Sequence, residues 1–538
     1  MLRPVVIAPT RSPVARGRSA PAPDGGRALG ALRTPAVLAT GAAVAAFVLY
    51  AATASHGAAW DDGGELGAGV AKLGIVHADG YPAYVLGGWV FAHLEPFGSL
   101  ATRASLWSAL AGAAAVGAMA YLVAWRARSL LGGALAALLL AGGGLFWSHA
   151  TEPSVYPLLV LSLVLLLIAA YRWEEQPTPR QLAWLAAAAG LVSVSHRSGF
   201  MFLAAAAVLV VARGGQRRLL RPANLAALTA VLAPWLTALY IPLRAHAHVF
   251  PNALISGHTN WWGLITAPGP SYDQPFRVAG GAIVTNAWNL ALLVVDQLSV
   301  AAIVLVPLGI ARLRCDRVFL LCGLAPALIA SALAATTTGS YAFWHLPLLT
   351  VLAFAAGAAV PTLSRAVDSR GGPAAAPRRR GLTAAATAAT ALAALTGAGL
   401  GIVYTAAHHD DASGWAGRVL GALPPHATIT APWSAYAGLI ATQELEHRRP
   451  EVRVVLARHW PTSRSDLATA SGYLVAMDVG PTPPAPAGVA LTKLGTTADV
   501  ERKGLTGLRF AGRLLGDVQY RAQAYEARPS ARVRKFGK

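Results

Sequence analysis

Charged side chains are scarce in this sequence. Asp, Glu, Lys and Arg together make up 13% of the 538 residues, whereas 55% of the residues are apolar. Soluble domains carry about a quarter of their residues as charged side chains, so this composition excludes a set of soluble domains. The alternating pattern of a membrane barrel is also missing, while several apolar runs reach about 20 residues, enough for a helix to cross a bilayer. The sequence therefore predicts an α-helical polytopic membrane protein.

Cysteines and acidic residues are scarce as well. The two cysteines, Cys315 and Cys322, lie seven positions apart with no second pair, which indicates neither a disulfide framework nor a metal site. The 24 acidic residues are outnumbered by 44 Lys and Arg, which gives a net charge of +20. Such a charge can serve nucleic-acid binding, but Arg is concentrated where membrane proteins anchor their cytoplasmic loops. No nucleic-acid partner is therefore expected.

Eleven apolar segments predict a bundle of about eleven transmembrane helices. They are residues 35–54, 105–124, 130–147, 155–171, 181–196, 199–212, 223–242, 285–310, 318–335, 341–361 and 381–404. With the N-terminus in the cytoplasm, the cytoplasmic loops hold 22 Lys and Arg against 5 in the short outer loops, as the positive-inside rule requires. This count requires residues 181–212 to form two short spans that reverse at His196 and Arg197.

The segment before the first span predicts a separate region. Residues 1–34 contain six Arg and one Asp among Pro, Gly and Ala, which is typical of a disordered basic cytoplasmic tail. The first span ends in a sequence that imitates a signal-peptidase site, but the long basic region before it favours an uncleaved anchor. Residues 35–404 then form the transmembrane domain, with outer loops at residues 55–104 and 243–284.

The composition changes after the last predicted span. Residues 405–538 are expected to form a soluble α/β domain, because two short buried strands at 427–430 and 452–456 flank an amphipathic segment at 434–446. That order predicts a βαβ unit. An odd number of spans places this domain on the outer side of the plasma (inner) membrane.

The first outer loop concentrates acidic, histidine and aromatic side chains between Trp60 and Tyr84. Asp62 and Glu65 lie three apart, and apolar residues then recur at helical spacing, so a short interfacial helix is predicted from Asp62. One interpretation is a capping box, in which Asp62 caps the helix and Glu65 bonds back. The other places the same acids at the lip of a membrane cavity, where a partly desolvated carboxylate accepts a proton from a bound nucleophile.

The loop then turns at Tyr81. Pro82 is predicted to begin a second short helix that runs to Leu94 along the membrane surface, because about 18 Å of helix is too short to cross. His77 is either an interface histidine with satisfied hydrogen bonds or, beside Asp79 and Tyr81, a phosphate ligand.

Three motifs stand out in this loop: Asp62-Gly63-Gly64-Glu65, Gly74-Ile75-Val76-His77 and Gly80-Tyr81-Pro82-Ala83-Tyr84. Further motifs follow along the chain: Phe146-Trp147-Ser148, Val155-Tyr156, Gly190 with His196, Tyr240-Ile241-Pro242-Leu243-Arg244, Asn260-Trp261-Trp262-Gly263, Leu423-Pro424-Pro425-His426-Ala427 and Arg449-Pro450-Glu451-Val452-Arg453-Val454-Val455. Together they resemble the transmembrane protein O-mannosyltransferase-like family of the GT-C glycosyltransferases. The resemblance covers most of residues 35–460.

The chain departs from the family pattern at three places. Gly63 stands where the family usually has Ser, and Ala78-Asp79 replaces Pro-Pro. Ser154 occupies the position of a Glu that often precedes Val-Tyr, and Glu152 lies two residues earlier as its substitute.

The resemblance implies a GT-C-like bundle that transfers a mannose-like sugar, with inversion, from a polyprenyl-phosphate donor to an extracytoplasmic protein or glycan. An acid of the first outer loop would act as general base: Asp62 first, Asp61 in reserve, with Glu65 beside them. The residues expected to bind substrate are His77, Tyr81, Tyr84, Arg103, Glu152, Tyr156, His196, Arg197, Arg244, Trp261 and Trp262.

Each substrate-binding interpretation has a plainer alternative. Arg103, Arg197 and Arg244 lie at predicted outer ends of spans, where they bind the lipid phosphate or extend along the bilayer as interface residues. Trp261 and Trp262 stack on a sugar or belong to the interfacial aromatic belt. His149, Glu152 and Tyr156 share a short outer loop, where they line the acceptor path or cap helix ends.

Two other functions stay open at this point. A transporter or flippase of lipid-linked glycans would use acids within spans, such as Asp296 beside Gln297, although a polar contact between helices explains that acid as well. The third possibility is a non-catalytic membrane scaffold. No cofactor is expected, because the lipid-linked sugar is a substrate; no cluster of metal ligands is apparent, and a divalent ion is left open.

Overall fold

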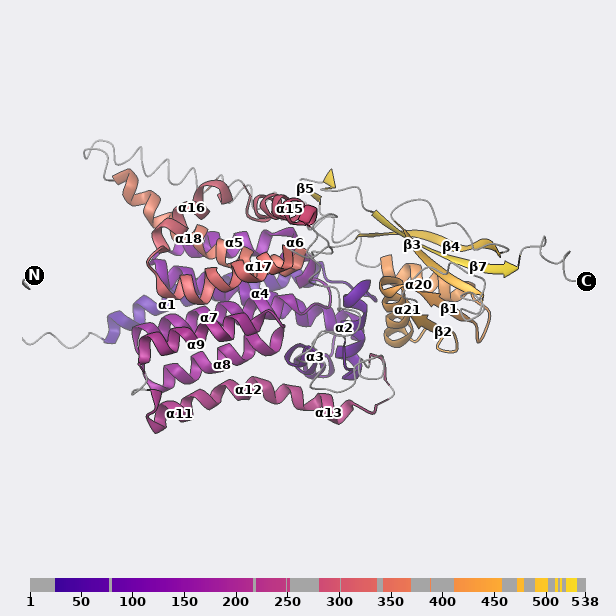
Figure 1. Ribbon diagram of the computed structural model, residues 1–538, viewed down its shortest axis with the longest axis horizontal. Coiled ribbons are helices and arrows are strands. Elements are labelled where there is room, and N and C mark those ends of the chain that lie inside the picture. The colour runs from indigo at the N-terminus through magenta and orange to yellow at the C-terminus, as the bar shows by residue number, and fades with distance from the viewer. Residues whose placement is uncertain are drawn as a thin grey trace, which may run out of the picture.

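The computed structural model describes residues 25–76, 80–215, 219–247, 249–251, 280–299, 301–335, 342–368, 388, 411–456, 472–478, 489–501, 509–510, 513–514 and 519–529. It shows a bundle of helices and a C-terminal unit of helices and strands that lies beyond one end of the bundle (Figure 1). This arrangement confirms the predicted fold class.

Helices make up the whole N-terminal part. In chain order they are α1 (Gly25–Ala52), α2 (Asp61–Lys72), α3 (Pro82–Leu94), α4 (Leu100–Ala127), α5 (Leu130–Gly142), α6 (Gly144–Ala150), α7 (Tyr156–Glu175), α8 (Pro179–Ser195), α9 (Gly199–Gly214), α11 (Pro222–Leu228), η1 (Thr229–Val231), α12 (Leu232–Trp235), η2 (Leu236–Leu239), α13 (Tyr240–Arg244), α15 (Gly280–Leu298), α16 (Ala301–Leu313), η4 (Phe319–Leu324), α17 (Ala325–Ala335), η5 (Ala342–His345) and α18 (Leu346–Asp368).

Within the described residues, five helical segments are long and apolar enough to cross a membrane, or up to seven if each of two bent pairs counts as one span. The five are Thr34–Ala52, Leu100–Ala127, Tyr156–Glu175, Pro222–Arg244 and Ala342–Thr362. The predicted number of about eleven is not reached by this criterion for three reasons. Phe319–Ala335 is a shorter helix, and the eleventh predicted span lies almost wholly outside the described residues. In addition, α8 and α9 have 17 and 16 residues, whereas a crossing needs about 20. Both nevertheless pack beside α7 in the bundle.

The first ten predicted spans all coincide with helical segments, while the eleventh, 381–404, lies outside the described residues apart from residue 388. Two of the ten are bent rather than straight. α5 and α6 meet at 69°, and the helices that replace the predicted span 285–310 meet at 97°. Glycine at 143 and the left-handed Ser299 stand at these breaks, where a continuous helix is interrupted.

The predicted boundary of the N-terminal tail is wrong. α1 begins at Gly25, so the last part of the tail predicted for residues 1–34 is helical. Ala, Leu and Arg dominate the residues just before Pro35, and these are strong helix formers that extend the helix beyond its apolar part. The apolar stretch itself, Thr34–Ala52, agrees with the predicted first span. Residues 1–24 lie outside the described part.

The loops of the bundle separate into two groups, one at each end. Arg126, in the last turn of α4, donates to Asp316 at 2.9 Å, which joins two segments predicted to be cytoplasmic. At the other end, the amide of Ser55 donates to the carbonyl of Thr151 at 2.8 Å, which joins two loops predicted to be outside. The chain reverses between α8 and α9, as predicted. These contacts agree with the predicted pairing of the loops, while the full topology and which end faces the cytoplasm stay predictions.

The C-terminal unit contains a sheet with the strand order β2-β1-β3-β7-β4. Its elements are α20 (Asp411–Ala422), β1 (Thr428–Ala431), α21 (Trp433–Glu446), β2 (Arg453–Leu456), β3 (Tyr473–Asp478), β4 (Val489–Glu501) and β7 (Gln519–Pro529). A separate small pair, β5 (Arg509–Phe510) and β6 (Arg513–Leu514), lies with β5 against α15 of the bundle. β1 pairs in parallel with β2 across α21. This confirms the predicted βαβ unit, within about two residues at each boundary.

Two sequence motifs of this unit meet in space. The guanidinium of Arg449 donates to the carbonyl of Leu423 at 2.9 Å and to that of Leu420 at 3.1 Å, where α20 ends. It also contacts the carboxylate of Glu451. The motif that begins at Arg449 therefore closes the turn that the Leu423 motif makes after α20.

The C-terminal unit is joined to the bundle through α2 and α21, which pack against each other (Figure 1). Gly64 on α2 approaches so closely that an added Cβ would lie 2.9 Å from the carbonyl oxygen of Ala437. The rings of Trp60 and Trp415 lie 5.1 Å apart, and Lys72 forms an ion pair with Glu444. The first outer loop thus lies between the bundle and the C-terminal unit.

Candidate active site

The two consecutive acids of the first outer loop form the first turn of α2. The helix begins at Asp61, whose φ of +51° is left-handed, and the residue before it, Trp60, is the N-cap without a side-chain cap bond. Asp62 is therefore inside the helix, and the capping-box interpretation of Asp62 with Glu65 is wrong. A left-handed, non-glycine residue is strained, and strain of this kind gathers at functional sites.

Both acids contact the C-terminal unit. Nε1 of Trp433 donates to Oδ1 of Asp62 at 3.1 Å, and the hydroxyl of Ser434 donates to Oδ1 of Asp61. Trp433 and Ser434 are the first two residues of α21. The amino ends of two helices thus meet at the carboxylates, where helix dipoles favour negative charge.

Glu65 lies one turn further along α2 and is 3% exposed. Burial raises the pKa of the Tyr436 phenol on α21, and the nearby carboxylate of Glu65 raises it further. On the bundle side, the hydroxyl of Tyr240 donates to the carbonyls of Gly74 at 3.2 Å and Gly80 at 3.3 Å. Tyr240 therefore holds the backbone at Gly74 and at Gly80, before and after the short stretch that connects α2 with α3.

A cluster of aromatic side chains connects Tyr81, just before α3, to the turn between α8 and α9. The rings of Tyr81 and His196 stack with centroids 5.9 Å apart, and the hydroxyl of Tyr156 lies 3.5 Å from Nε2 of His196. Nδ1 of His196 lies 2.9 Å from the hydroxyl of Ser198. The structure thus brings together three predicted substrate-binding residues that come from distant parts of the sequence.

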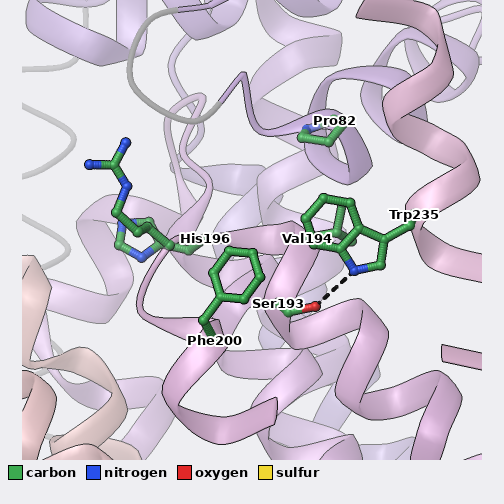
Figure 2. Close-up of a pocket in the computed structure, with 7 residues that line it drawn as sticks. Pro82, Ser193, Val194, His196, Phe200 and Trp235 are labelled. Carbon is green, nitrogen blue, oxygen red and sulfur yellow. Dashed lines mark hydrogen bonds between the residues drawn. The ribbon is translucent and has the colours of Figure 1, made fainter. Parts of the chain in front are cut away.

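A pocket opens beside this group (Figure 2). It is small and partly open, and it is lined by Pro82, Ser193, Val194, His196, Arg197, Phe200 and Trp235. Figure 2 shows the ring of Phe200 between His196 and Trp235, whose Nε1 donates to the hydroxyl of Ser193 at 3.0 Å. The lining thus combines apolar residues with a histidine and an arginine.

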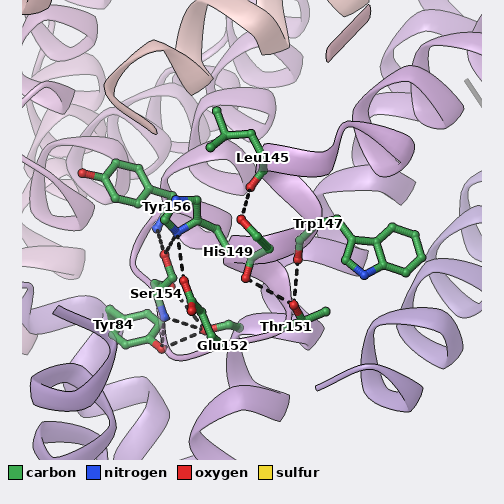
Figure 3. Close-up of polar contacts among 10 residues, drawn as sticks. Tyr84, Leu145, Trp147, His149, Thr151, Glu152, Ser154 and Tyr156 are labelled. Carbon is green, nitrogen blue, oxygen red and sulfur yellow. Dashed lines mark hydrogen bonds and ion pairs between the residues drawn. The ribbon is translucent and has the colours of Figure 1, made fainter. Parts of the chain in front are cut away.

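The loop from α6 to α7 is held by a polar network (Figure 3). Nδ1 of His149 lies 2.8 Å from the hydroxyl of Ser154 and 3.8 Å from the carboxylate of Glu152. Because both partners contact the same ring nitrogen, the three residues cannot form a relay in which acid and hydroxyl engage opposite nitrogens. His149 and Ser154 are buried, so the network fixes the loop.

Tyr84 belongs to that network and not to a substrate surface. It is completely buried, and its hydroxyl lies 2.8 Å from the hydroxyl of Ser108 while accepting the amide of Ser154 at 2.9 Å. The predicted substrate-binding role of Tyr84 is thus corrected to one of joining α3, α4 and the loop before α7 (Figure 3).

Two of the three predicted phosphate-binding arginines hold backbone instead. Arg103 donates to the carbonyls of Gly98 at 3.0 Å and Ala92 at 3.1 Å. Arg244 donates to the carbonyls of Lys72 and Leu73, where α2 ends. Orphan carbonyls at helix ends are natural partners of such donors. Among the three, Arg197 is the one that lines the pocket.

Other predicted residues are placed as follows. His77, Trp261 and Trp262 lie outside the described residues, as does most of the outer loop 243–284. Asp296 accepts a hydrogen bond from its neighbour Gln297, whose own oxygen accepts the amide of Leu145 at 2.8 Å. These contacts favour the interpretation of Asp296 as part of a polar contact between helices over its interpretation as part of an ion-coupled transport path. In the described part of the chain, no group of three His, Cys, Asp or Glu could hold a metal, and metal dependence stays a prediction.

Sequence reasoning missed the partners from the C-terminal unit. Trp433, Ser434 and Tyr436 contact or face the acids of α2, although the sequence indicated an amphipathic helix and nothing more. It also missed Phe200 and Trp235, which line the pocket from two other helices. No local pattern connects these residues with the first outer loop, because the helices meet only in the folded chain.

Known proteins resemble this chain in sequence and in fold. The family model described as the Protein O-mannosyl-transferase TMEM260 N-terminal domain matches residues 62–219. The Protein O-mannosyl-transferase TMEM260 of Mus musculus is 34% identical over 126 residues, which cover 23% of this chain and 18% of that protein. The match therefore spans less than a fifth of the relative's length.

Among solved structures, ArnT from Cupriavidus metallidurans bound to undecaprenyl phosphate aligns with a TM-score of 0.51. The alignment covers 82% of this chain and 92% of that chain at 14% identity, so it bears on the fold alone. Together, the matches confirm the resemblance to an O-mannosyltransferase-like family with the GT-C fold, as the motifs of the first outer loop indicated.

Proposed function

From this resemblance and this fold, we propose that the chain is an integral membrane glycosyltransferase. It transfers a mannose-like sugar, with inversion, from a polyprenyl-phosphate donor to a hydroxyl of a protein or glycan outside the cell membrane. The observation that carries the proposal is the position of Asp61 and Asp62. The family match begins at residue 62, and both acids lie at the junction of the bundle and the C-terminal unit.

The reaction needs a proton acceptor beside the acceptor hydroxyl. The hydroxyl oxygen attacks the anomeric carbon, the bond from that carbon to the phosphate oxygen breaks, and its electron pair leaves with the lipid phosphate. The hydroxyl proton passes to the carboxylate of Asp62, which acts as general base. Asp61 is the reserve for this role, and the buried Glu65 supports the same turn of helix.

The leaving lipid phosphate needs hydrogen-bond donors. Arg197 and His196 line the pocket at the same end of the bundle as α2, and a guanidinium suits a phosphate through paired N–H groups. The apolar wall formed by Phe200 and Trp235 suits the isoprenoid that follows the phosphate. The ArnT structure, solved with undecaprenyl phosphate, supports a lipid phosphate as the ligand class for this fold.

The orientation follows from the distribution of positive charge. The loops that carry most of the Arg residues gather at the end of the bundle marked by Arg126 and Asp316, so this end faces the cytoplasm. The acids and the C-terminal unit then face outwards. The proposal therefore includes a cytoplasmic N-terminus, with the plasma (inner) membrane as the location.

The test is transfer from a synthetic polyprenyl-phosphate mannose by the purified full chain in liposomes. Asp62→Asn should lower the transfer rate roughly 100-fold or more, the usual scale for loss of a general base. The thermal unfolding midpoint should stay unchanged, because Asn keeps the shape and an oxygen for Trp433. Asp61→Asn tests whether Asp61 acts as the general base in place of Asp62. Full transfer in both variants would overturn the mechanism.

A further inference from the structure

Three neighbouring residues of α21 face the three acids of α2. Trp433 donates to Asp62 and Ser434 donates to Asp61. The carboxylate of Glu65 raises the pKa of the Tyr436 phenol, so these two side chains are also close. Trp433 and Asp62 are separated by 371 positions in the sequence. The match of donor to acid thus depends on how the C-terminal unit sits on the bundle.

The contact is held by the packing around it. At Gly64, in the same turn of α2, an added Cβ would lie 2.9 Å from the carbonyl oxygen of Ala437, which is a backbone atom. At the other end of the two helices, Lys72 forms an ion pair with Glu444. α2 and α21 are therefore fixed at both ends, and the donors of α21 are held against the acids.

An N–H donor on a general base has a defined effect. A carboxylate has two oxygens and about four lone-pair positions, so one indole N–H occupies a fraction of its capacity and leaves the carboxylate able to take a proton. The same bond stops rotation of the carboxylate, and catalytic groups work only within a narrow range of orientations.

We propose that the C-terminal unit completes the active site, with Trp433 and Ser434 as positioning residues that orient the carboxylates of Asp62 and Asp61 for proton transfer. The inference rests on the proposed function. It adds that, without the C-terminal unit, the carboxylates of Asp61 and Asp62 in the bundle would not be held in one orientation. It also assigns a role in the reaction to α21, none of whose residues is among those that line the pocket at Arg197 in the described part of the chain.

The test compares single variants of the full chain in the transfer assay. Trp433→Phe keeps a ring and removes the N–H, and should lower kcat about ten-fold, the scale of one hydrogen bond to a charged group. KM for donor and acceptor should not change. Trp433→His restores a ring N–H and should recover part of kcat. Ser434→Ala removes the hydroxyl that donates to Asp61 and should also lower kcat. Ser434→Thr keeps a hydroxyl and should recover the lost kcat.

Trp173→Phe is the matched control. Trp173 lies in the last turn of α7 in the bundle, and its Nε1 is buried with no hydrogen-bond partner in the described part of the chain. Its replacement makes the same chemical change away from the contact between α2 and α21. It should lower thermal stability and leave kcat of the folded protein unchanged.

A double variant separates positioning from general loss of structure. In the Asp62→Asn background, Trp433→Phe should cause little further loss, because Trp433 acts through Asp62. Additive losses, or a kcat for Trp433→Phe equal to that of the unmodified protein while Asp62→Asn is inactive, would overturn the positioning role alone. Full activity of Asp62→Asn would instead overturn the proposed function.

Discussion

Arg244 donates a hydrogen bond from Nη2 to the carbonyl oxygen of Lys72 at 3.0 Å. Lys72 is the last residue of α2, so this guanidinium supports the helix that carries the acids. The motif that contains Arg244 pointed to the lipid phosphate. The structure instead makes it a link between the end of the α11–α13 segment and the first outer loop, and leaves Arg197 as the guanidinium at the pocket.

Replacement of Arg244 should therefore act on stability first. Arg244→Ala removes a charged donor from two carbonyls of a helix end, and should lower the free energy of unfolding by about 1.5–3 kcal/mol. Arg244→Lys should recover only part, because a single ammonium replaces a planar fork. Thermal unfolding in detergent measures both. A large rise in donor KM with unchanged stability would contradict the capping role.

Arg197 should show the opposite pattern. Arg197→Ala removes the guanidinium from the pocket, so KM for the lipid-phosphate donor should rise about ten-fold or more, as expected for loss of a charge-assisted contact. The acceptor KM should stay constant. Arg103→Ala is the matched control, because Arg103 holds backbone carbonyls away from the pocket. An equal donor KM in both variants would remove Arg197 from the donor site.

The ion pair between Lys72 and Glu444 tests the docking of the C-terminal unit. Both side chains are about one third exposed, so the pair contributes about 0.2–1 kcal/mol. Lys72→Glu and Glu444→Lys each place like charges together and should lower transfer. The double exchange should restore it, because the opposite charges meet again. Failure of the double variant to exceed either single variant would show that this contact does not matter for docking.

Acid should weaken the C-terminal unit through Glu451. The hydrogen bond from Arg449 lowers the pKa of this carboxyl below its ordinary value of 4.5. A group whose pKa is lower in the folded state adds stability that is complete above pH 4.5 and is lost as the pH falls through the lowered value. Glu451→Gln should thus unfold at a lower temperature than the unmodified chain at pH 6. The two midpoints should converge near pH 3, and a gap that persists there would refute the assignment.

The native cysteines report on topology. Cys315 is exposed in a loop predicted to be cytoplasmic, and Cys322 is buried. In intact cells, an impermeant maleimide should label Ala422→Cys, at an exposed position of the C-terminal unit, and not Cys315. In permeabilised cells, the maleimide should label both cysteines. Labelling of Cys315 from outside would reverse the orientation.

Local patterns predicted local structure well. The short helix after Trp60, the helix begun by Pro82 and the βαβ unit around residues 434–446 all follow from periodicity and turn residues, and all are present. The cap at Asp62 was wrong because a backbone conformation decides it: Asp61 turns left-handed and makes Trp60 the N-cap. Spacing alone carries no signal for that turn.

The partners of the predicted site residues could not be read from the sequence. Arg103 and Arg244 looked alike as arginines at outer ends of spans, yet both bind carbonyls that the fold brings to them. The donor from Trp433 comes from a helix whose docking depends on surfaces of both units. Residue type limits what a side chain can bind, whereas tertiary packing decides which partner it meets.

The two adjacent glycines between Asp62 and Glu65 explain one departure from the family motif. At Gly63 an added Cβ would lie 2.9 Å from the Cβ of Ala59, and at Gly64 it would lie 2.6 Å from the carbonyl oxygen of Ala59. A serine at position 63 would therefore act as a wedge under the loop that leads into α2. Gly64, whose added Cβ would also lie 2.9 Å from the carbonyl oxygen of Ala437, sets how closely α2 approaches the C-terminal unit, and hence whether the indole of Trp433 can reach Asp62 at all.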